Sequence, residues 1–412
     1  MKAARTQWGS ACAIGSEPPS KCRRGSSPYV AASRNRLRAL PSHCNVVIDG
    51  GTVKEAGAAI AHKSCAIVEC YRRHDEVYLT TVHLLKQLGY EVHVFNVWRN
   101  RIKNSFVHAP GLKPHIHSRL TASSVLEAVC KQHFDLVVFN TFEGREVLSC
   151  AREVLRHAPV LGFIHNGSMV CNLKEYEPYL NHPRCRLMVL APYVGEHFAP
   201  LAPANTVTPV FFFDRRVPGI PRTAGRRRFC VQGYFDPGRR HYELLLEALK
   251  DLRAEGRADF EVYVMGRSFD RRFRDFARQV REAGLASHVH YSWKGIGYRS
   301  YYRLLNSMDF MLPLISPESH PTYFKSKSTS SIAAAVGFGA IPVTHERLAQ
   351  HYALANSAIT YTTDLKSALR RALDIDDDEL AAMRARLALV RERYLENSLR
   401  ELGEAIAKVS KA

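Results

Sequence analysis

The chain has 412 residues, of which 46% are hydrophobic, 24% charged and 10% aromatic. This length and composition predict two or three globular domains and exclude a fully disordered, collagen-like or disulfide-scaffold protein. Lys and Arg total 58 against 39 Asp and Glu, and the formal net charge of +19 favours anionic partners such as phosphorylated ligands, nucleic acid or acidic membrane surfaces.

Residues 1–63 differ in composition from the rest of the chain. They carry ten Lys or Arg against three acidic residues, and the beginning is rich in Arg, Ser and Ala. A disordered basic tail, a misplaced gene start and an organelle transit peptide all fit this composition. Trp8, Pro18 and Pro19 interrupt any amphipathic helix, and no apolar segment typical of a secretory signal is present. We expect a cytoplasmic protein, or an organellar one if the segment is a transit peptide.

Ten cysteines are spread along the chain without a Cys-x-x-Cys pair or the paired spacing of a zinc site. We expect reduced thiols and predict no metal site. No uncharged apolar stretch reaches the ~18 residues of a transmembrane helix. Contact with a membrane, if any, is therefore expected to be peripheral.

From Cys65 onward, short apolar runs alternate with longer amphipathic stretches, which is typical of parallel α/β architecture. An alternative first strand at 45–49, with Gly50-Gly51 as a phosphate turn, would leave an irregular gap of ~15 residues, which is long for a compact domain. In the first half the pattern predicts strands at 65–69, 91–97, 135–140, 160–165 and 186–190, and helices at 76–88, 123–133 and 143–157.

A Pro-, Gly- and Arg-rich stretch after Pro209 separates this half from a second α/β block. An acidic run from Asp376 to Glu379 then favours the start of one or two C-terminal helices over 376–409. In the second block we predict strands at 228–232, 260–265, 289–292, 310–314, 341–344 and 358–361, and helices at 240–254, 273–283, 298–306, 329–337 and 365–373.

The predicted fold class is α/β, with two Rossmann-like, doubly wound domains that face a central cleft. The first domain is expected at 64–208, a linker at 209–227, and the second domain at 228–373, followed by the C-terminal helices at 374–412. Parallel sheets of this kind bind ligands at the carboxyl ends of their strands.

Two strand-to-helix loops of the second block carry residues suited to phosphate. The first loop leads from Gly233 through a Pro-Gly turn to Arg239 and Arg240, at a helix start where backbone amides also favour an anion. The second carries Lys325, Lys327 and several hydroxyl side chains before a helix, where they can cap the helix and contact phosphate. Ordinary loops with solvated basic side chains are the alternative for both.

Further candidates lie at other expected strand ends. His165 ends a strand, and Trp293 or Tyr298 could stack on a base. Gly266 and Arg267 follow another strand, where a simple turn is the alternative. His74, Asp75 and Glu76 open a helix, where they could face an acceptor or only cap the helix.

The segment from Gly233 to Leu249 resembles the start of the C-terminal domain of GT-B glycosyltransferases of the group 1, family 4 kind. In that family a strand, a glycine, a Pro-containing turn and a basic pair precede a Leu-rich helix. Residues 308–343 are similar to the later donor-binding segment, which ends in Gly-x-x-Pro-Val, here Gly339 to Val343. In layout, the resemblance extends from Cys65 to the C-terminus.

The resemblance implies a GT-B fold and C-terminal helices that pack back on the first domain. It also implies transfer of a sugar from a UDP- or GDP-linked nucleotide sugar to a carbohydrate, lipid or protein acceptor, with retention at the anomeric carbon and without a required metal or other cofactor. The catalytic residues implied are Arg239, Arg240, Lys327 and His165. The resemblance and the positions at strand ends together predict the donor-binding residues Gly233, Tyr234, Gly266, Arg267, Trp293, Glu318, Lys325, Ser328, Thr329 and Ser330.

The sequence also departs from this family. Its members usually carry two glutamates eight positions apart; Glu318 lies near the first, but the second falls among Ser330, Ser331 and two alanines. Tyr234 stands where Arg is common. These departures keep open a GT-B-like binding or scaffold protein without catalysis. The hypothesis of a nucleic-acid-binding protein is supported by the net charge alone. Because the sequence contains no recognised nucleic-acid-binding module, we expect no nucleic-acid partner.

Overall fold

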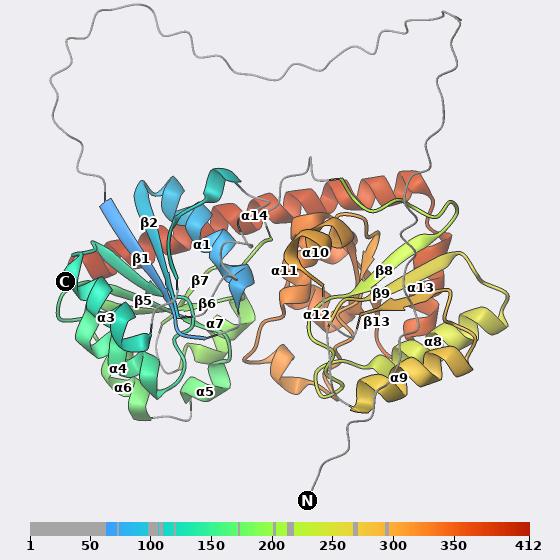
Figure 1. Ribbon diagram of the computed structural model, residues 1–412, viewed down its shortest axis with the longest axis horizontal. Helices are drawn as coiled ribbons and strands as arrows, with labels where there is room; N and C mark the ends of the chain where they lie inside the picture. Colours follow the sequence, from blue (N-terminus) through green and yellow to red (C-terminus); the bar gives the residue numbers. More distant parts are fainter. Residues whose placement is uncertain are drawn as a thin grey trace, which may run out of the picture. The chain divides into compact units, whose positions relative to one another are not determined.

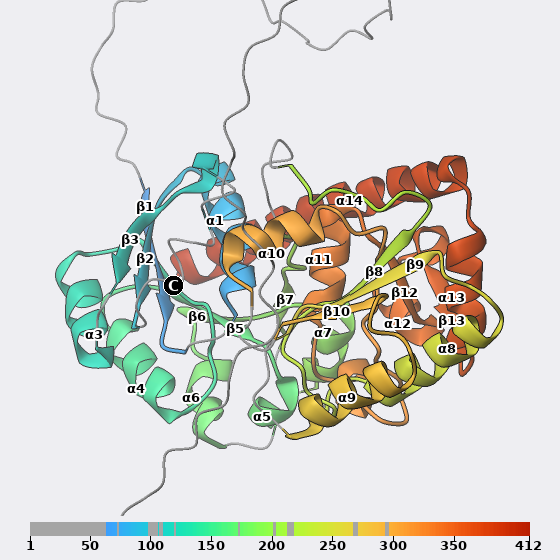
Figure 2. The same cartoon turned by 45° about the vertical axis from the view of Figure 1, so that its right-hand side comes forward.

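The computed structural model describes residues 63–71, 74–97, 106, 110–118, 121–171, 174–200, 203–211, 218–266, 271–292 and 296–412. Two parallel sheets with flanking helices make up these residues (Figures 1 and 2). The alternative strand at 45–49 lies outside them, as does nearly all of the basic segment 1–63, so those predictions stay untested. None of the helices in the described ranges has the length and apolar character needed to cross a membrane.

The first sheet contains seven parallel strands in the order β3-β2-β1-β4-β5-β6-β7. Its central strands are apolar and almost completely buried, because helices cover both faces of such a sheet. Edge strands β3 and β7 are short and were not predicted. The strands are β1 (Lys63–Glu69), β2 (Tyr90–Asn96), β3 (His115–Ser118), β4 (Leu136–Phe139), β5 (Val160–Ile164), β6 (Cys185–Val189) and β7 (Asn205–Thr206).

The three helices predicted in the first half begin within two residues of the expected positions, whereas the short helices α5, α6 and α7 were not predicted. The hydroxyl of Thr121 accepts a hydrogen bond from the amide of Ser124, and the Ser124 hydroxyl accepts one from the amide of Thr121, which fixes the start of α3. The helices are α1 (Asp75–Gln87), α3 (Ala122–Lys131), α4 (Arg145–Val154), α5 (Gly167–Cys171), α6 (Glu177–Leu180) and α7 (Pro192–Phe198).

The second sheet contains six parallel strands in the order β10-β9-β8-β11-β12-β13. They are β8 (Arg227–Val231), β9 (Phe260–Val264), β10 (Val289–Tyr291), β11 (Phe310–Met311), β12 (Ile341–His345) and β13 (Ile359–Tyr361). The helices are α8 (Tyr242–Ala254), α9 (Arg271–Glu282), α10 (Tyr298–Leu305), α11 (Ser330–Phe338), α12 (Glu346–His351) and α13 (Leu365–Asp374), and η3 (Pro321–Phe324) is a 3-10 turn.

In each sheet the chain reverses its direction of winding once, between β1 and β4 in the first sheet and between β8 and β11 in the second. The predicted α/β class with two doubly wound parallel sheets is therefore confirmed. Such a switch point opens a crevice at the carboxyl ends of the two strands, which is where this type of sheet binds ligands.

The chain ends in one long helix, α14 (Asp377–Ser410), where one or two helices were predicted. The side chain of Asp376 caps it by accepting a hydrogen bond from the amide of Glu379. The helix contacts α1 and β7 of the first half and α11 and β12 of the second (Figure 1). It is thus packed against elements of both sheets.

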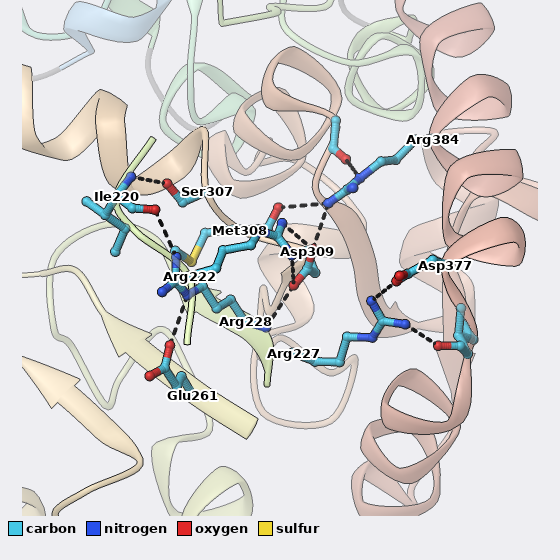
Figure 3. A network of polar contacts seen from close by, with 12 residues as sticks. Ile220, Arg222, Arg227, Arg228, Glu261, Ser307, Met308, Asp309, Asp377 and Arg384 are labelled. Carbon is cyan, nitrogen blue, oxygen red and sulfur yellow. Dashed lines mark hydrogen bonds and ion pairs between the residues drawn. The ribbon is translucent and has the colours of Figure 1, made fainter. Parts of the chain in front are cut away.

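A buried carboxylate, Asp309, ties α14 to the second sheet (Figure 3). It is 0% exposed and precedes β11. Its oxygens accept hydrogen bonds from Arg222 Nη2 at 2.7 Å, Arg384 Nη2 at 2.8 Å and the amide of Arg228 at 3.0 Å. The side chain of Arg228 is itself paired with Glu261, at 2.9 Å. These groups lie at the amino ends of the strands, opposite the expected ligand edge.

We predict that Asp309→Asn lowers the free energy of unfolding by about 1–3 kcal/mol, because a fully buried carboxylate loses its charge while the half-exposed Arg222 and Arg384 lose their charge partner. Urea unfolding followed by tryptophan fluorescence measures this change. Glu127→Gln is the matched control, since it neutralises an exposed carboxylate paired with Lys131 and should leave the unfolding midpoint nearly unchanged. Equal midpoints for the two variants would contradict the role given to Asp309.

Candidate functional site

A cavity of about 150 Å³ is lined by residues of both halves of the fold. Side chains that follow β5 and β8 and those at the start of α11 face it. It therefore includes the ligand edge of the second sheet. The sequence-predicted site residues that line it are His165, Gly233, Tyr234, Arg239, Arg240, Lys327, Ser328, Thr329 and Ser330.

The conformation of the loop after β8 requires glycine at two positions, Gly233 and Gly266. Gly233 has a φ of 99°, and a Cβ there would lie 3.0 Å from Nη2 of Arg240. A Cβ on Gly266, which follows β9, would lie 2.0 Å from the carbonyl oxygen of Gly233. Gly266 does not line the cavity, but because it has no side chain the end of β9 can lie close to the loop at Gly233.

The two neighbouring arginines differ in their surroundings. Arg240 is only 7% exposed; its Nη2 donates to the hydroxyl of Ser331 at 3.1 Å, and its Nε is buried without a hydrogen-bond partner. The side chain of Arg239 is 44% exposed and its Nε lies 3.1 Å from a carboxylate oxygen of Asp236. No described carboxylate forms an ion pair with Arg240. Because a buried charge is costly unless it is paired, Arg240 is the arginine suited to an anionic ligand.

Hydroxyl side chains connect the start of α11 to the end of β8. The hydroxyl of Thr329 accepts a hydrogen bond from the amide of Ser331 and caps the helix. The hydroxyls of Ser330 and Ser331 donate to Oε1 of Gln232, at 3.3 and 3.2 Å. The start of α11 thus faces the cavity beside Arg240, where the helix dipole adds to the positive potential.

The segment before α11 lies against the first half through its backbone. The carbonyl of Ser326 accepts from the amide of Gly167 at 2.7 Å, and Lys327 forms an isolated β-bridge with Asn166. The hydroxyl of Tyr193 donates to the carbonyl of Lys327 at 2.8 Å. The side chain of Lys327 remains available to the cavity, with its Nζ 4.9 Å from the centre of a tyrosine ring.

On the opposite side of the cavity, His165 follows β5. Its Nε2 lies 2.7 Å from the carbonyl oxygen of Asn140, and because that oxygen can only accept, Nε2 carries the hydrogen. The ring stacks on His74, with centroids 3.6 Å apart. Burial, together with a smaller effect of the positive charge of Lys327, lowers the pKa of His165 to about 4. The imidazole is therefore neutral at pH 7.

Two buried carboxylates support these histidines. Oε1 of Glu143 accepts hydrogen bonds from the amides of His165 and Asn166, both at 2.6 Å, and burial raises the pKa of Glu143. Oε2 of Glu69 accepts from Asn140 Nδ2 and the Thr141 hydroxyl, both at 2.8 Å. Sequence analysis missed both glutamates. The available signal was an acidic residue at the end of an apolar strand, as in Glu69, the last residue of β1.

Besides Gly266, two predicted site residues that the structure describes, Glu318 and Lys325, do not line the cavity. Glu318 and Lys325 have exposed side chains, and hydrogen bonds from its own backbone and from Ser316 lower the pKa of Glu318. Arg267 and Trp293 lie outside the described residues. Tyr234 lines the cavity but is 53% exposed, so part of its ring faces solvent.

We predict that His165 makes the stability of the fold depend on pH between 6.5 and 4. The unfolded chain binds a proton below the usual histidine pKa of 6.5, whereas the folded chain binds it only near 4. The stabilisation is thus complete above pH 6.5 and is lost as the pH falls toward 4. Between pH 7.5 and 4.5, wild type should lose roughly 2 kcal/mol more than His165→Gln in urea unfolding. Parallel losses in both proteins would refute the neutral, buried state.

Comparison with known proteins identifies the fold. No protein-family model matches the sequence, and no curated protein is similar to it in sequence. Among solved structures, a glycosyltransferase from Rickettsia africae matches with a TM-score of 0.60 at 12% identity, over 85% of this chain and 99% of that one. Anabaena Alr3699/HepE, solved in complex with UDP and glucose, matches with a TM-score of 0.61 at 13% identity, over 84% and 100%.

The N-terminal domain of trehalose-6-phosphate phosphatase from Candida albicans is also similar, with a TM-score of 0.55 at 10% identity, over 86% of this chain and 98% of that one. Structures of a glycosyltransferase and of a phosphatase domain are thus both similar to this fold. The similarities extend over both sheets and confirm the predicted GT-B fold.

Proposed function

We propose that the protein is a glycosyltransferase that uses a UDP- or GDP-linked sugar as its donor. The observation that carries the proposal is Arg240, a buried guanidinium without a carboxylate partner among the described residues, beside a cavity that Lys327 and the start of α11 also line. Two cations and a helix N-terminus match the charge of a departing diphosphate. The likeness in fold to Anabaena HepE, which was solved with UDP and glucose, supports a nucleotide sugar as the ligand.

The size of the cavity determines how such a donor would be placed. At about 150 Å³ it is smaller than the ~300–1,000 Å³ of typical ligand pockets, so it would hold the diphosphate and part of the sugar. The nucleoside would extend past the half-exposed Tyr234, whose ring can stack on a base. The donor-binding roles of Arg267 and Trp293 remain predictions from the sequence.

The transfer replaces one bond to the anomeric carbon with another. The bond to the diphosphate oxygen breaks, the bond to the acceptor oxygen forms, and the proton of the acceptor hydroxyl must be taken up. No Asp or Glu is among the described residues that line the cavity, and neutral His165, with a pKa of about 4, is a weak base. We infer that the departing diphosphate accepts the proton on the same face of the sugar, which retains the anomeric configuration.

The same lining supports a reaction that requires no metal ion. Magnesium is usually held by carboxylates together with the substrate phosphates. Here Arg240 and Lys327 provide positive charge at the cavity, and a lining carboxylate is lacking among the described residues. For the acceptor we propose a hydroxyl of a carbohydrate, a lipid or a protein.

We predict that Arg240→Ala weakens UDP binding by 10- to 100-fold, since a hydrogen bond to a charged group contributes about 1.5–3 kcal/mol. Isothermal titration calorimetry measures the dissociation constant. Arg239→Ala should have a smaller effect because that side chain is exposed and paired with Asp236. Arg253→Ala, on the exposed side of α8, is the control and should bind as wild type does. An equal loss in both cavity variants would contradict the assignment to Arg240.

The activity itself is tested with labelled nucleotide sugars and a panel of acceptors. We expect release of nucleoside diphosphate only when an acceptor is present, unchanged by EDTA, and at least 100-fold slower in Arg240→Ala, because that variant loses stabilisation of the leaving group. If wild type binds the nucleotide but transfers no sugar to any acceptor, the binding-protein alternative is favoured. If it binds neither UDP nor GDP, the proposed site is wrong.

A further inference from the structure

Four polar side chains meet on one face of the first sheet, away from the cavity. Strands β2 and β3 run parallel there, with His93 opposite His115 and Phe95 opposite His117. Side chains of a strand alternate between its two faces, so Glu91 and His93 share a face of β2 and His115 and His117 share a face of β3. The parallel register brings these two pairs together.

The nitrogen and oxygen atoms in this cluster are close enough to share an ion. Nε2 of His115 lies 2.9 Å from Oε1 of Glu91, and Nε2 of His93 lies 3.6 Å from the same oxygen. One donor atom from each of these three residues lies within 4.8 Å of the other two. The rings of His93 and His115 are stacked, with centroids 4.7 Å apart.

We propose that Glu91, His93 and His115 bind a divalent transition-metal ion, with Zn²⁺ as the first candidate. Zinc lies about 2.0–2.2 Å from imidazole nitrogen and carboxylate oxygen, so tetrahedral ligand atoms are about 3.3 Å apart. The two distances to the Glu91 oxygen are already near that value, and small side-chain rotations bring the two histidine nitrogens closer. Two imidazoles and one carboxylate form a ligand set that suits zinc better than magnesium or calcium.

The exposure of the three side chains gives the ion a route and an open position. His115 is 61% exposed, Glu91 48% and His93 19%. Zinc therefore reaches the ligands from solvent, and water completes the fourth position.

His117 is a positioning residue for this site. Its Nε2 lies 3.2 Å from Nδ1 of His93, and its ring stacks on Phe95 with centroids 4.4 Å apart and planes 6° apart. When Nδ1 of His93 donates its hydrogen to His117, the lone pair of His93 Nε2 is free for the metal. Partners of this kind fix the tautomer and orientation of metal-binding histidines.

The site would join edge strand β3 to its neighbour. β3 has only four residues and pairs with β2 on one side. An ion held by Glu91 and His93 of β2 and by His115 of β3 adds a link across that pair, and it stabilises the folded state in proportion to its occupancy. None of these residues lines the cavity, so the proposal does not depend on the glycosyltransferase activity.

The test compares zinc bound by the full-length chain with zinc bound by a variant that combines Glu91→Gln and His115→Ala. Both side chains are largely exposed, so the fold should tolerate their replacement. After equilibrium dialysis against Zn²⁺, elemental analysis should show one zinc per chain fewer in the variant than in wild type. His157→Ala, which removes an exposed histidine after α4, should bind as much zinc as wild type. Measuring the difference accounts for zinc held by cysteines or histidines elsewhere in the chain.

Two further measurements make the outcome decisive. Zinc should raise the melting temperature of wild type more than that of the double variant. Cobalt should give visible d–d bands that the double variant lacks, without the charge-transfer band of cysteine ligands. Equal zinc content and equal melting shifts in both proteins would overturn the proposal and leave the cluster as hydrogen-bonded side chains only.

Discussion

A buried guanidinium that pairs with no carboxylate in the described part of the chain is the constraint on which the candidate site depends. Removing the charge of Arg240 from water costs free energy that no described carboxylate returns. The surrounding chain is shaped to hold it: Gly233 leaves room for the guanidinium, and Ser331 accepts one of its hydrogens. The network around Asp309, at the opposite ends of the strands, joins α14 to the second sheet. In the proposed function this cation binds the anionic diphosphate.

The structure shows which side chains stand where the glycosyltransferase family pattern has its second glutamate. The later of the two usual glutamates falls in a stretch that includes Ser330 and Ser331, and both hydroxyls bind Gln232 in this structure. A carboxylate at that place would neutralise Arg240 in part. Neutral hydroxyl and amide groups keep the start of α11 in position and leave the positive potential intact. Loss of that glutamate is thus compatible with a site for a diphosphate.

The sequence predicted the central strands and most helices because parallel strands covered on both faces are continuous apolar runs. It failed for β3, whose sequence His-Ile-His-Ser is polar, and for β7, which has two residues. Because β3 was not predicted, the proposed zinc site was not predicted either. Glu91 and His115 are separated in the chain and come together only through the register of β2 and β3. The sequence pattern predicted the basic pair Arg239 and Arg240. Only the burial of the side chains in the structure distinguishes Arg240 from Arg239.

In the segment between η3 and α11, the backbone and the side chains make different contacts. Its backbone binds the first half, through the carbonyls of Ser326 and Lys327, whereas the side chains of Lys327 and Thr329 face the cavity. These backbone contacts place Lys327 beside neutral His165, and a protonated imidazole there would repel the lysine. An anion held between Lys327 and Arg240 would therefore attract the same segment that joins the halves. The proposed donor would thus contact, through Lys327, the same short stretch of chain whose backbone binds the first half.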